Sequence, residues 1–272
     1  VESAEVATAL AAGDVARIGN PDVSIPDSSV WLGVVKANEE NGDRVQTSAS
    51  VASSPVVLAM VRPAAEQAGW PDQQLTWGEL LANYSASPVK VGIADPTRSA
   101  ATMLTFGGIR AALGTGEDAT VQLVGAVRLL AQRVSGTTEE VLGKLPQSLA
   151  ELTQPTLGRV SAFPFSEQGV WRYNQTDPAV PLAAIYPGDG SPLLDYPFTT
   201  LAGDGITADQ ARDNRDAAGK LLEGMLGDSG RLALSAQGFR TEDGTAGAGL
   251  EPSSGVLAAK PAELPPPDPQ AI

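Results

Sequence analysis

Short apolar runs of strand type alternate with segments of helical periodicity along most of the chain, and this alternation constrains the fold more than any other feature of the sequence. In "VKVGIADPTRSAATMLTFGGIRAALG", residues 89–114, the apolar residues up to Ala94 follow a strand pattern, and those from Met103 to Leu113 recur at helical spacing. Because strands and helices follow one another in this way, the sequence predicts α/β architecture with mainly parallel sheets.

Hydroxyl and small side chains stand where the predicted helix of this stretch begins. Thr97, Ser99, Ala100 and Thr102 occupy the turn between strand and helix. The first backbone N–H groups of a helix have no partner within the helix, so they bind side-chain oxygens or a ligand. A simple N-cap is the more frequent role of any one of these residues, and we interpret the Asp-Pro step at 95–96 as a turn.

Serine and aspartate recur before two further predicted helices. Asp27, Ser28 and Ser29 precede one helix, and Ser166 precedes the helix predicted in "SEQGVWRYN". Each of these clusters is a weak signal alone, because Ser and Asp are common helix caps. Their recurrence at several strand-to-helix turns is the argument for a shared function.

Composition excludes several classes of chemistry. The sequence contains no cysteine and no histidine, which removes thiol nucleophiles, Ser-His-Asp triads and imidazole acid–base catalysis. Acidic residues number 32 against 18 basic ones, and the resulting net charge of −14 disfavours nucleic acid as a partner. We therefore predict a protein that is not an enzyme, with no catalytic residue, no metal site and no cofactor.

Six strings, taken in order along the chain, resemble a known family. The family is the bacterial extracellular solute-binding protein of type 2 periplasmic-binding-protein fold, of the kind fused to a von Willebrand factor type A domain in actinobacteria. The strings are "PDVSIPDSSVWL" (21–32), "SSPVVLAM" (53–60), "AGWPDQQLTWGELL" (68–81), "VGIADPTRSAAT" (91–102), "YPGDGSPLLDYPF" (186–198) and "LLEGMLGDSGRLALSAQGFR" (221–240).

The resemblance implies a two-lobed α/β fold. Residues 1–90 and 187–240 would form lobe 1, residues 91–186 would form lobe 2, and residues 241–272 would form a Gly/Pro-rich linker or tail. Relative to that fold, an N-terminal strand and helix are missing from the sequence. Their absence would remove central sheet pairing and one wall of the cleft.

The same resemblance places a ligand site at strand ends and helix starts that face an inter-lobe cleft. It implies an extracellular solute-binding domain that captures a small polar or anionic ligand there and closes around it. The identity of the ligand does not follow from the sequence. The predicted ligand-binding residues are Asp27, Ser28, Ser29, Ser53, Ser54, Thr97, Ser99, Ala100, Thr102, Ser166 and Tyr186.

Two alternatives stay open from the residues themselves. The chain fits a protein-interaction or adhesion module that uses the same scaffold without binding a small molecule. Asp189 and Asp195 lie in a Gly/Pro-rich loop that fits either a calcium site or an ordinary turn, and we prefer the turn. The resemblance also implies an extracellular location, membrane anchoring through segments outside this chain, and a C-terminal von Willebrand factor A domain or a membrane partner.

Overall fold

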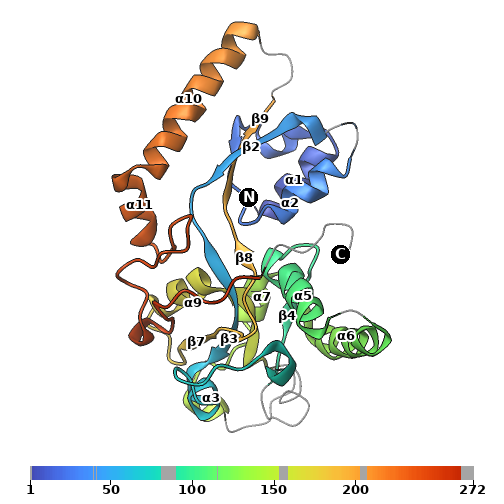
Figure 1. The fold of residues 1–272 in the computed structure, drawn as a ribbon, viewed down its shortest axis with the longest axis vertical. Coiled ribbons are helices and arrows are strands. Elements are labelled where there is room, and N and C mark those ends of the chain that lie inside the picture. The colour runs from blue at the N-terminus through green and yellow to red at the C-terminus, as the bar shows by residue number, and fades with distance from the viewer. Residues whose placement is uncertain are drawn as a thin grey trace. The chain divides into compact units, whose positions relative to one another are not determined.

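The computed structural model describes residues 2–38, 40, 42–80, 90–114, 116–152, 159–202 and 207–264. By its internal contacts the chain divides into two compact units, each built from two separate stretches. Unit 1 comprises Val1–Ser53 and Leu194–Gly247, and unit 2 comprises Ser54–Leu193 and Ala248–Ile272. Both units contain helices and strands (Figure 1), so the predicted α/β class is confirmed.

A three-stranded antiparallel sheet forms the centre of unit 1. Its order is β1-β9-β2, with Val23 opposite Thr200 and Val45 opposite Leu201. Figure 1 shows α10 along one side of this sheet and α1 with α2 on the other. The elements of unit 1 are α1 (Ser3–Ala11), η1 (Val15–Ile18), β1 (Val23–Ser24), α2 (Val30–Lys36), η2 (Gly42–Arg44), β2 (Val45–Ser50), β9 (Pro197–Leu201), α10 (Ala208–Leu226) and α11 (Asp228–Ser235).

Unit 2 is built around β3, whose eight residues are all buried. This strand lies between β6 and β7, and it runs antiparallel to both. Helices α5 and α9 pack against this sheet. The elements are β3 (Ser54–Val61), α3 (Arg62–Gln67), β4 (Ile93–Ala94), α5 (Ala100–Leu113), α6 (Glu117–Leu130), η3 (Ala131–Arg133), β5 (Val134–Ser135), α7 (Thr138–Leu142), α8 (Leu149–Leu152), β6 (Ala162–Ser166), α9 (Glu167–Asn174), β7 (Leu182–Ile185) and η4 (Pro252–Ser254), with β8 (Leu193–Leu194) at the boundary between the units.

The prediction of mainly parallel sheets is wrong. The pairs β1–β9, β2–β9, β3–β6 and β3–β7 are antiparallel, whereas β4–β5 is parallel. An alternation of strands and helices in sequence fixes the order of elements along the chain. It does not fix the direction of a partner strand that lies a hundred residues away, and β3 meets its two neighbours through connections of that length.

The compact units differ from the predicted lobes in extent. Strand β3 and helix α3, predicted in lobe 1, belong to unit 2, because β3 is the middle strand of that sheet. Residues 248–264, predicted as part of a linker or tail, also belong to unit 2, where Leu250 and Val256 are buried. Residues 81–89, which immediately precede the predicted lobe change at residue 90, lie outside the described residues. The proline run 265–272 lies outside them as well.

Candidate functional site

The turn before α5 is held by Asp95. One carboxylate oxygen accepts hydrogen bonds from the Thr97 backbone N–H at 2.8 Å and from the Thr97 hydroxyl at 2.7 Å. These bonds lower the pKa of the Asp95 carboxyl. The Asp95 carbonyl also accepts from the Ser99 N–H at 2.9 Å. Thr97 is therefore occupied within the turn, and the interpretation of the Asp-Pro step as a turn is consistent with this geometry.

The first turn of α5 contains buried polar groups that lack partners. Ser99 caps the helix by accepting from the Thr102 N–H at 3.3 Å. Among the described residues, no acceptor is found for the N–H groups of Ala100 and Ala101, which are 1% and 7% exposed. The hydroxyl of Thr102 is also buried without a partner. Because buried donors are almost always hydrogen-bonded in proteins, these groups make this helix start a candidate ligand site.

Helix α9 begins at a second cluster of predicted residues in unit 2. Ser166 caps it by accepting from the Gly169 N–H at 2.9 Å, and the Ser54 hydroxyl accepts from the Gln168 N–H at 3.0 Å. The structure thus brings Ser54 and Ser166 together at one helix start, where both side chains serve the helix itself.

Tyr186 is buried and bonded in unit 2. Its hydroxyl donates to a carboxylate oxygen of Glu167, the first residue of α9, at 2.6 Å. Glu167 is fully buried, and it was not among the predicted site residues. Its place beside Ser166 in the sequence was the available signal, but a glutamate in the first helical turn is usually a solvated residue that interacts with the helix dipole.

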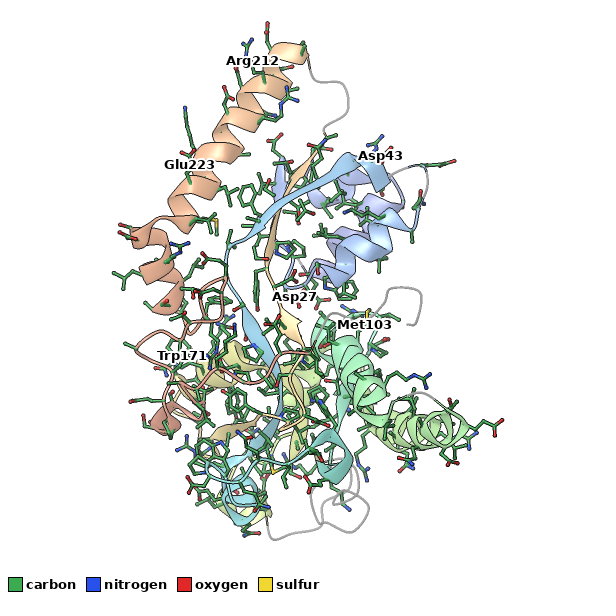
Figure 2. All side chains as sticks on the ribbon, viewed as in Figure 1. Asp27, Asp43, Met103, Trp171, Arg212 and Glu223 are labelled. Atoms are coloured by element: carbon green, nitrogen blue, oxygen red, sulfur yellow. The ribbon has the colours of Figure 1, made fainter. Side chains whose placement is uncertain are left out.

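The start of α2, in unit 1, is closed by the protein's own side chains. Asp195 accepts from the Ser29 N–H at 2.7 Å, and the Ser28 hydroxyl accepts from the Val30 N–H at 3.3 Å. Asp27, labelled in Figure 2, accepts from the Trp31 indole N–H at 2.7 Å. Burial raises the pKa of the Asp27 carboxyl. The side chains of Asp195 and Ser28 therefore occupy the N–H donors at this helix start that were predicted to bind an anionic ligand.

The predicted ligand residue Ser53 and the two possible calcium ligands, Asp189 and Asp195, also form hydrogen bonds within the protein. The Ser53 hydroxyl donates to the Thr241 carbonyl at 2.7 Å in unit 1. Asp189 accepts from the Trp77 backbone N–H through both carboxylate oxygens, at 3.0 and 3.2 Å. Within the described part of the chain, no group of three or more Asp and Glu side chains is arranged to hold a metal ion. Asp189 and Asp195 therefore act as acceptors for backbone N–H groups.

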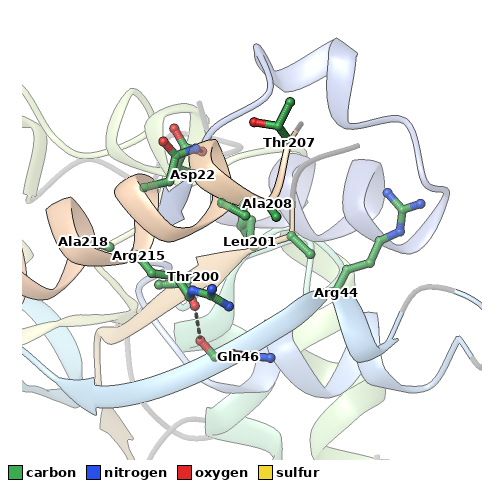
Figure 3. Close-up of a pocket in the computed structure, with 12 residues that line it drawn as sticks. Asp22, Arg44, Gln46, Thr200, Leu201, Thr207, Ala208, Arg215 and Ala218 are labelled. Atoms are coloured by element: carbon green, nitrogen blue, oxygen red, sulfur yellow. Dashed lines mark hydrogen bonds between the residues drawn. The ribbon is translucent and has the colours of Figure 1, made fainter. Parts of the chain in front are cut away.

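Unit 1 has a separate groove of about 300 Å³ between α10 and the end of the sheet (Figure 3). The inner face of α10 carries Ala208, Ala211 and Ala218 along this groove, and further along the helix Leu222 and Met225 fill the corresponding space. Arg44 and Arg215 reach the groove from η2 and α10. Its described lining includes none of the predicted ligand-binding residues.

The chain belongs to the bacterial extracellular solute-binding protein family, whose model matches residues 1–240. No curated protein sequence matches the chain. No helix among the described residues combines the length and apolar character needed to cross a bilayer.

Solved structures of binding proteins share the fold at low sequence identity. A periplasmic thiamin binding protein superposes with a TM-score of 0.59 at 15% identity, over 91% of this chain and 74% of its own. The sulfate-binding protein SubI from Mycobacterium tuberculosis gives 0.57 at 16% identity, over 97% and 80%. The fructose-6-phosphate-bound binding protein AfuA from Actinobacillus pleuropneumoniae gives 0.54 at 14%, over 90% and 76%. These likenesses establish the fold, and the two-lobed type 2 periplasmic-binding-protein class predicted from sequence agrees with them.

Proposed function

We propose that this chain captures a small polar ligand in the inter-lobe cleft that the sequence predicts, and that it changes from an open to a closed form on binding. Membership of a solute-binding family supports ligand capture. The observation that carries the proposal is the start of α5, where the N–H groups of Ala100 and Ala101 and the hydroxyl of Thr102 are buried without partners. We assign these three groups as the donors that the helix start offers to a ligand with oxygen acceptors.

The unit 1 residues favour a ligand that also carries donors. Asp27 and Asp195 present carboxylates at the start of α2, and the N–H groups of Ser29 and Val30 are already bonded to Asp195 and Ser28. A simple anion would meet like charge there, whereas a hydroxyl or ammonium group would meet an acceptor. We therefore favour a polar ligand with both donors and acceptors over a bare oxyanion.

Thermal unfolding with a set of probes tests this proposal. The probes are sulfate, phosphate, thiamin, sugars, polyols and amino acids, each added at rising concentration. A probe present at about one hundred times its dissociation constant stabilises the folded state by about 2.7 kcal/mol. A shift with one chemical class supports ligand capture. If no class gives a shift, the small-molecule proposal fails and the protein-interaction module becomes the better explanation.

Two threonines of α5 give a matched pair of variants for the same test. Thr102→Val removes a buried hydroxyl without a partner, so we expect the free energy of unfolding of the free protein to rise by about 1 kcal/mol. We also expect the probe to stabilise this variant less than the unaltered chain. Thr105→Val, one turn further on, removes a buried hydroxyl that donates to the Ala101 carbonyl, so it should destabilise the free protein and leave probe affinity unchanged. Full probe affinity in Thr102→Val would contradict a ligand role for Thr102.

The partners and location that the resemblance implies also belong to this proposal. We infer an extracellular domain that is held at a membrane through segments outside this chain, and that works with a von Willebrand factor A domain or a membrane partner. The extracellular family supports the location. Small-angle scattering of the protein with the stabilising probe tests closure, because an unchanged radius of gyration at saturation would contradict it.

A further inference from the structure

The C-terminal strap, which we define as residues 249–264, lies beyond the residues that the family model matches. Its composition predicts a linker, yet it packs as an integral part of unit 2. Leu250 is 2% exposed and Val256 is fully buried. Leu257 and Leu264 pack against an apolar cluster of the same unit that includes Leu58 and Ile185. The strap is therefore fixed at several points along its length.

Backbone hydrogen bonds extend the sheet and the following loop of unit 2 with this segment. The Ala184 N–H, on β7, donates to the Gly255 carbonyl at 2.8 Å. Ser191 donates from its N–H to the Ala262 carbonyl at 2.8 Å and accepts at its own carbonyl from the Leu264 N–H at 3.0 Å. The two bonds of Ser191 form an isolated parallel β-bridge with Glu263, so the strap is held there through main-chain atoms.

Three long side chains of unit 2 hold the first half of the strap. Trp171, labelled in Figure 2, donates from its indole N–H to the Gly249 carbonyl at 3.1 Å. Asn174 donates to the Ser254 carbonyl at 2.9 Å, and Arg62 donates to the Ser253 carbonyl at 3.1 Å. Two of these side chains come from α9, so the helix and the strap are joined directly.

Gly255 is the point where the strap comes closest to its neighbours. Its φ of 84° lies in the left-handed region, which glycine adopts without strain. A Cβ atom there would lie 2.3 Å from both the Asn174 side-chain nitrogen and the Leu182 carbonyl oxygen. A larger residue at this position must push the strap away from α9 and β7.

The strap also fixes the direction of the Tyr186 hydrogen bond. The Leu257 N–H donates to the Tyr186 hydroxyl oxygen at 3.1 Å, while that hydroxyl donates its proton to Glu167 at 2.6 Å. Both contacts end at buried groups, and Glu167 is the first residue of α9. A continuous path of hydrogen bonds thus runs from the strap through Tyr186 to the helix start that Ser166 caps.

We propose that the C-terminal strap is a positioning element that holds the first turn of α9 in place through Tyr186 and Glu167. The proposal assigns Tyr186 to this path, as a residue that acts on the site through Glu167. Its importance for ligand capture rests on the proposed function, since Ser166 is a predicted ligand-binding residue. Its physical content concerns α9 alone and needs no ligand to be tested.

Hydrogen exchange of the full chain, measured without any ligand, tests the strap. In Gly255→Ala we expect the strap amides and those of Gln168 and Gly169 to exchange at least tenfold faster than in the unaltered chain. In Tyr186→Phe, which keeps the ring and removes both hydrogen bonds, the amides of Leu257, Gln168 and Gly169 should respond in the same direction. Glu167→Gln retains an acceptor for the Tyr186 hydroxyl, so it should restore most of the protection that Glu167→Ala loses.

Two control variants separate the effect of the strap from the effect of backbone strain or of losing any tyrosine hydroxyl. Gly19→Ala has nearly the same left-handed φ, 85°, with no atom within 4 Å of the added Cβ, so it carries the backbone strain without the clash. Tyr173→Phe removes a tyrosine hydroxyl from the same unit whose contact with the Val180 carbonyl is long, at 3.5 Å. Neither should change exchange in the first turn of α9.

Unchanged exchange at Gln168 and Gly169 in Tyr186→Phe overturns the proposal. This outcome can be read even if Gly255→Ala unfolds the whole of unit 2. This result would leave ligand capture untouched. Conversely, the absence of any stabilising probe would remove the proposed function without altering the expected exchange pattern, so the two failures can be told apart.

Discussion

The starts of α2 and α5 look alike in sequence and differ in the structure. Each has a short run of Asp, Ser or Thr before an apolar helix. At α2 the nearest N–H groups are bonded to Asp195 and Ser28, whereas at α5 the N–H groups of Ala100 and Ala101 have no acceptor among the described residues. A polar cluster before a helix therefore predicts free N–H donors, but it does not predict whether a distant residue already accepts from them.

The largest expected effect comes from removing the acceptor that closes α2. Asp195→Ala leaves the Ser29 N–H unpaired, and we expect the free energy of unfolding of unit 1 to fall by about 1.5–3 kcal/mol, as for other hydrogen bonds to charged groups. Asp195→Asn keeps an oxygen acceptor without the charge and should lose about half as much. Urea unfolding measures both, and equal stability of all three chains would show that Asp195 does not close this helix.

Serine-to-alanine changes at the two helices test whether only α5 depends on a serine cap. Ser99→Ala removes the side-chain cap of α5 and should cost about 1 kcal/mol of stability. Ser29 precedes α2 without a side-chain cap bond, so Ser29→Ala should change the stability by less than about 0.5 kcal/mol. The difference between the two midpoints of unfolding is the measurement. A larger loss in Ser29→Ala than in Ser99→Ala would reverse the comparison.

The smallest expected effect is a pH dependence of opposite sign at the two helices. The folded pKa of Asp27 is raised above 3.8 by burial, so its contribution to stability falls as the pH rises from 3.8 through the folded pKa. The folded pKa of Asp95 is lowered by its bonds to Thr97, so its contribution is complete above 3.8 and is lost as the pH falls through the folded pKa.

Unfolding midpoints of Asp27→Asn and Asp95→Asn, each compared with the unaltered chain at several acidic pH values, measure these contributions. Substitution of Asp27 should remove a loss of stability above pH 3.8, and substitution of Asp95 should remove a loss below it. For each variant, the difference in stability from the unaltered chain is plotted against pH. Slopes of the same sign for the two variants would contradict the environments assigned to Asp27 and Asp95.

Local sequence patterns predicted the helices of the candidate site well. The helix after Ser99 and the helix after Ser166 begin where apolar periodicity and helix caps place them. Strands β2 and β9 were not predicted, because "VQTSAS" and "PFTTL" are short and largely polar. Such strands gain their stability from pairing with each other, which is a tertiary effect.

The contacts that decide whether a site is open could not be predicted from sequence. Asp195 reaches the N–H of Ser29 across 166 positions, and no local pattern encodes such a pairing. The strap was misjudged for a related reason, since its Gly and Pro content is typical of linkers. Its packing depends on a few isolated apolar residues, such as Leu250 and Val256, that find a prepared surface in unit 2.

The half of α10 that carries alanines beside the groove should tolerate larger side chains better than most buried helix faces do. Most buried helix faces are already filled, so larger residues introduced there strain the core. At Ala211, beside the groove, a leucine would enter free space and extend the row of large apolar residues that begins at Leu222. Larger apolar residues on this face of α10 should therefore raise the thermal stability of unit 1 without repacking the sheet.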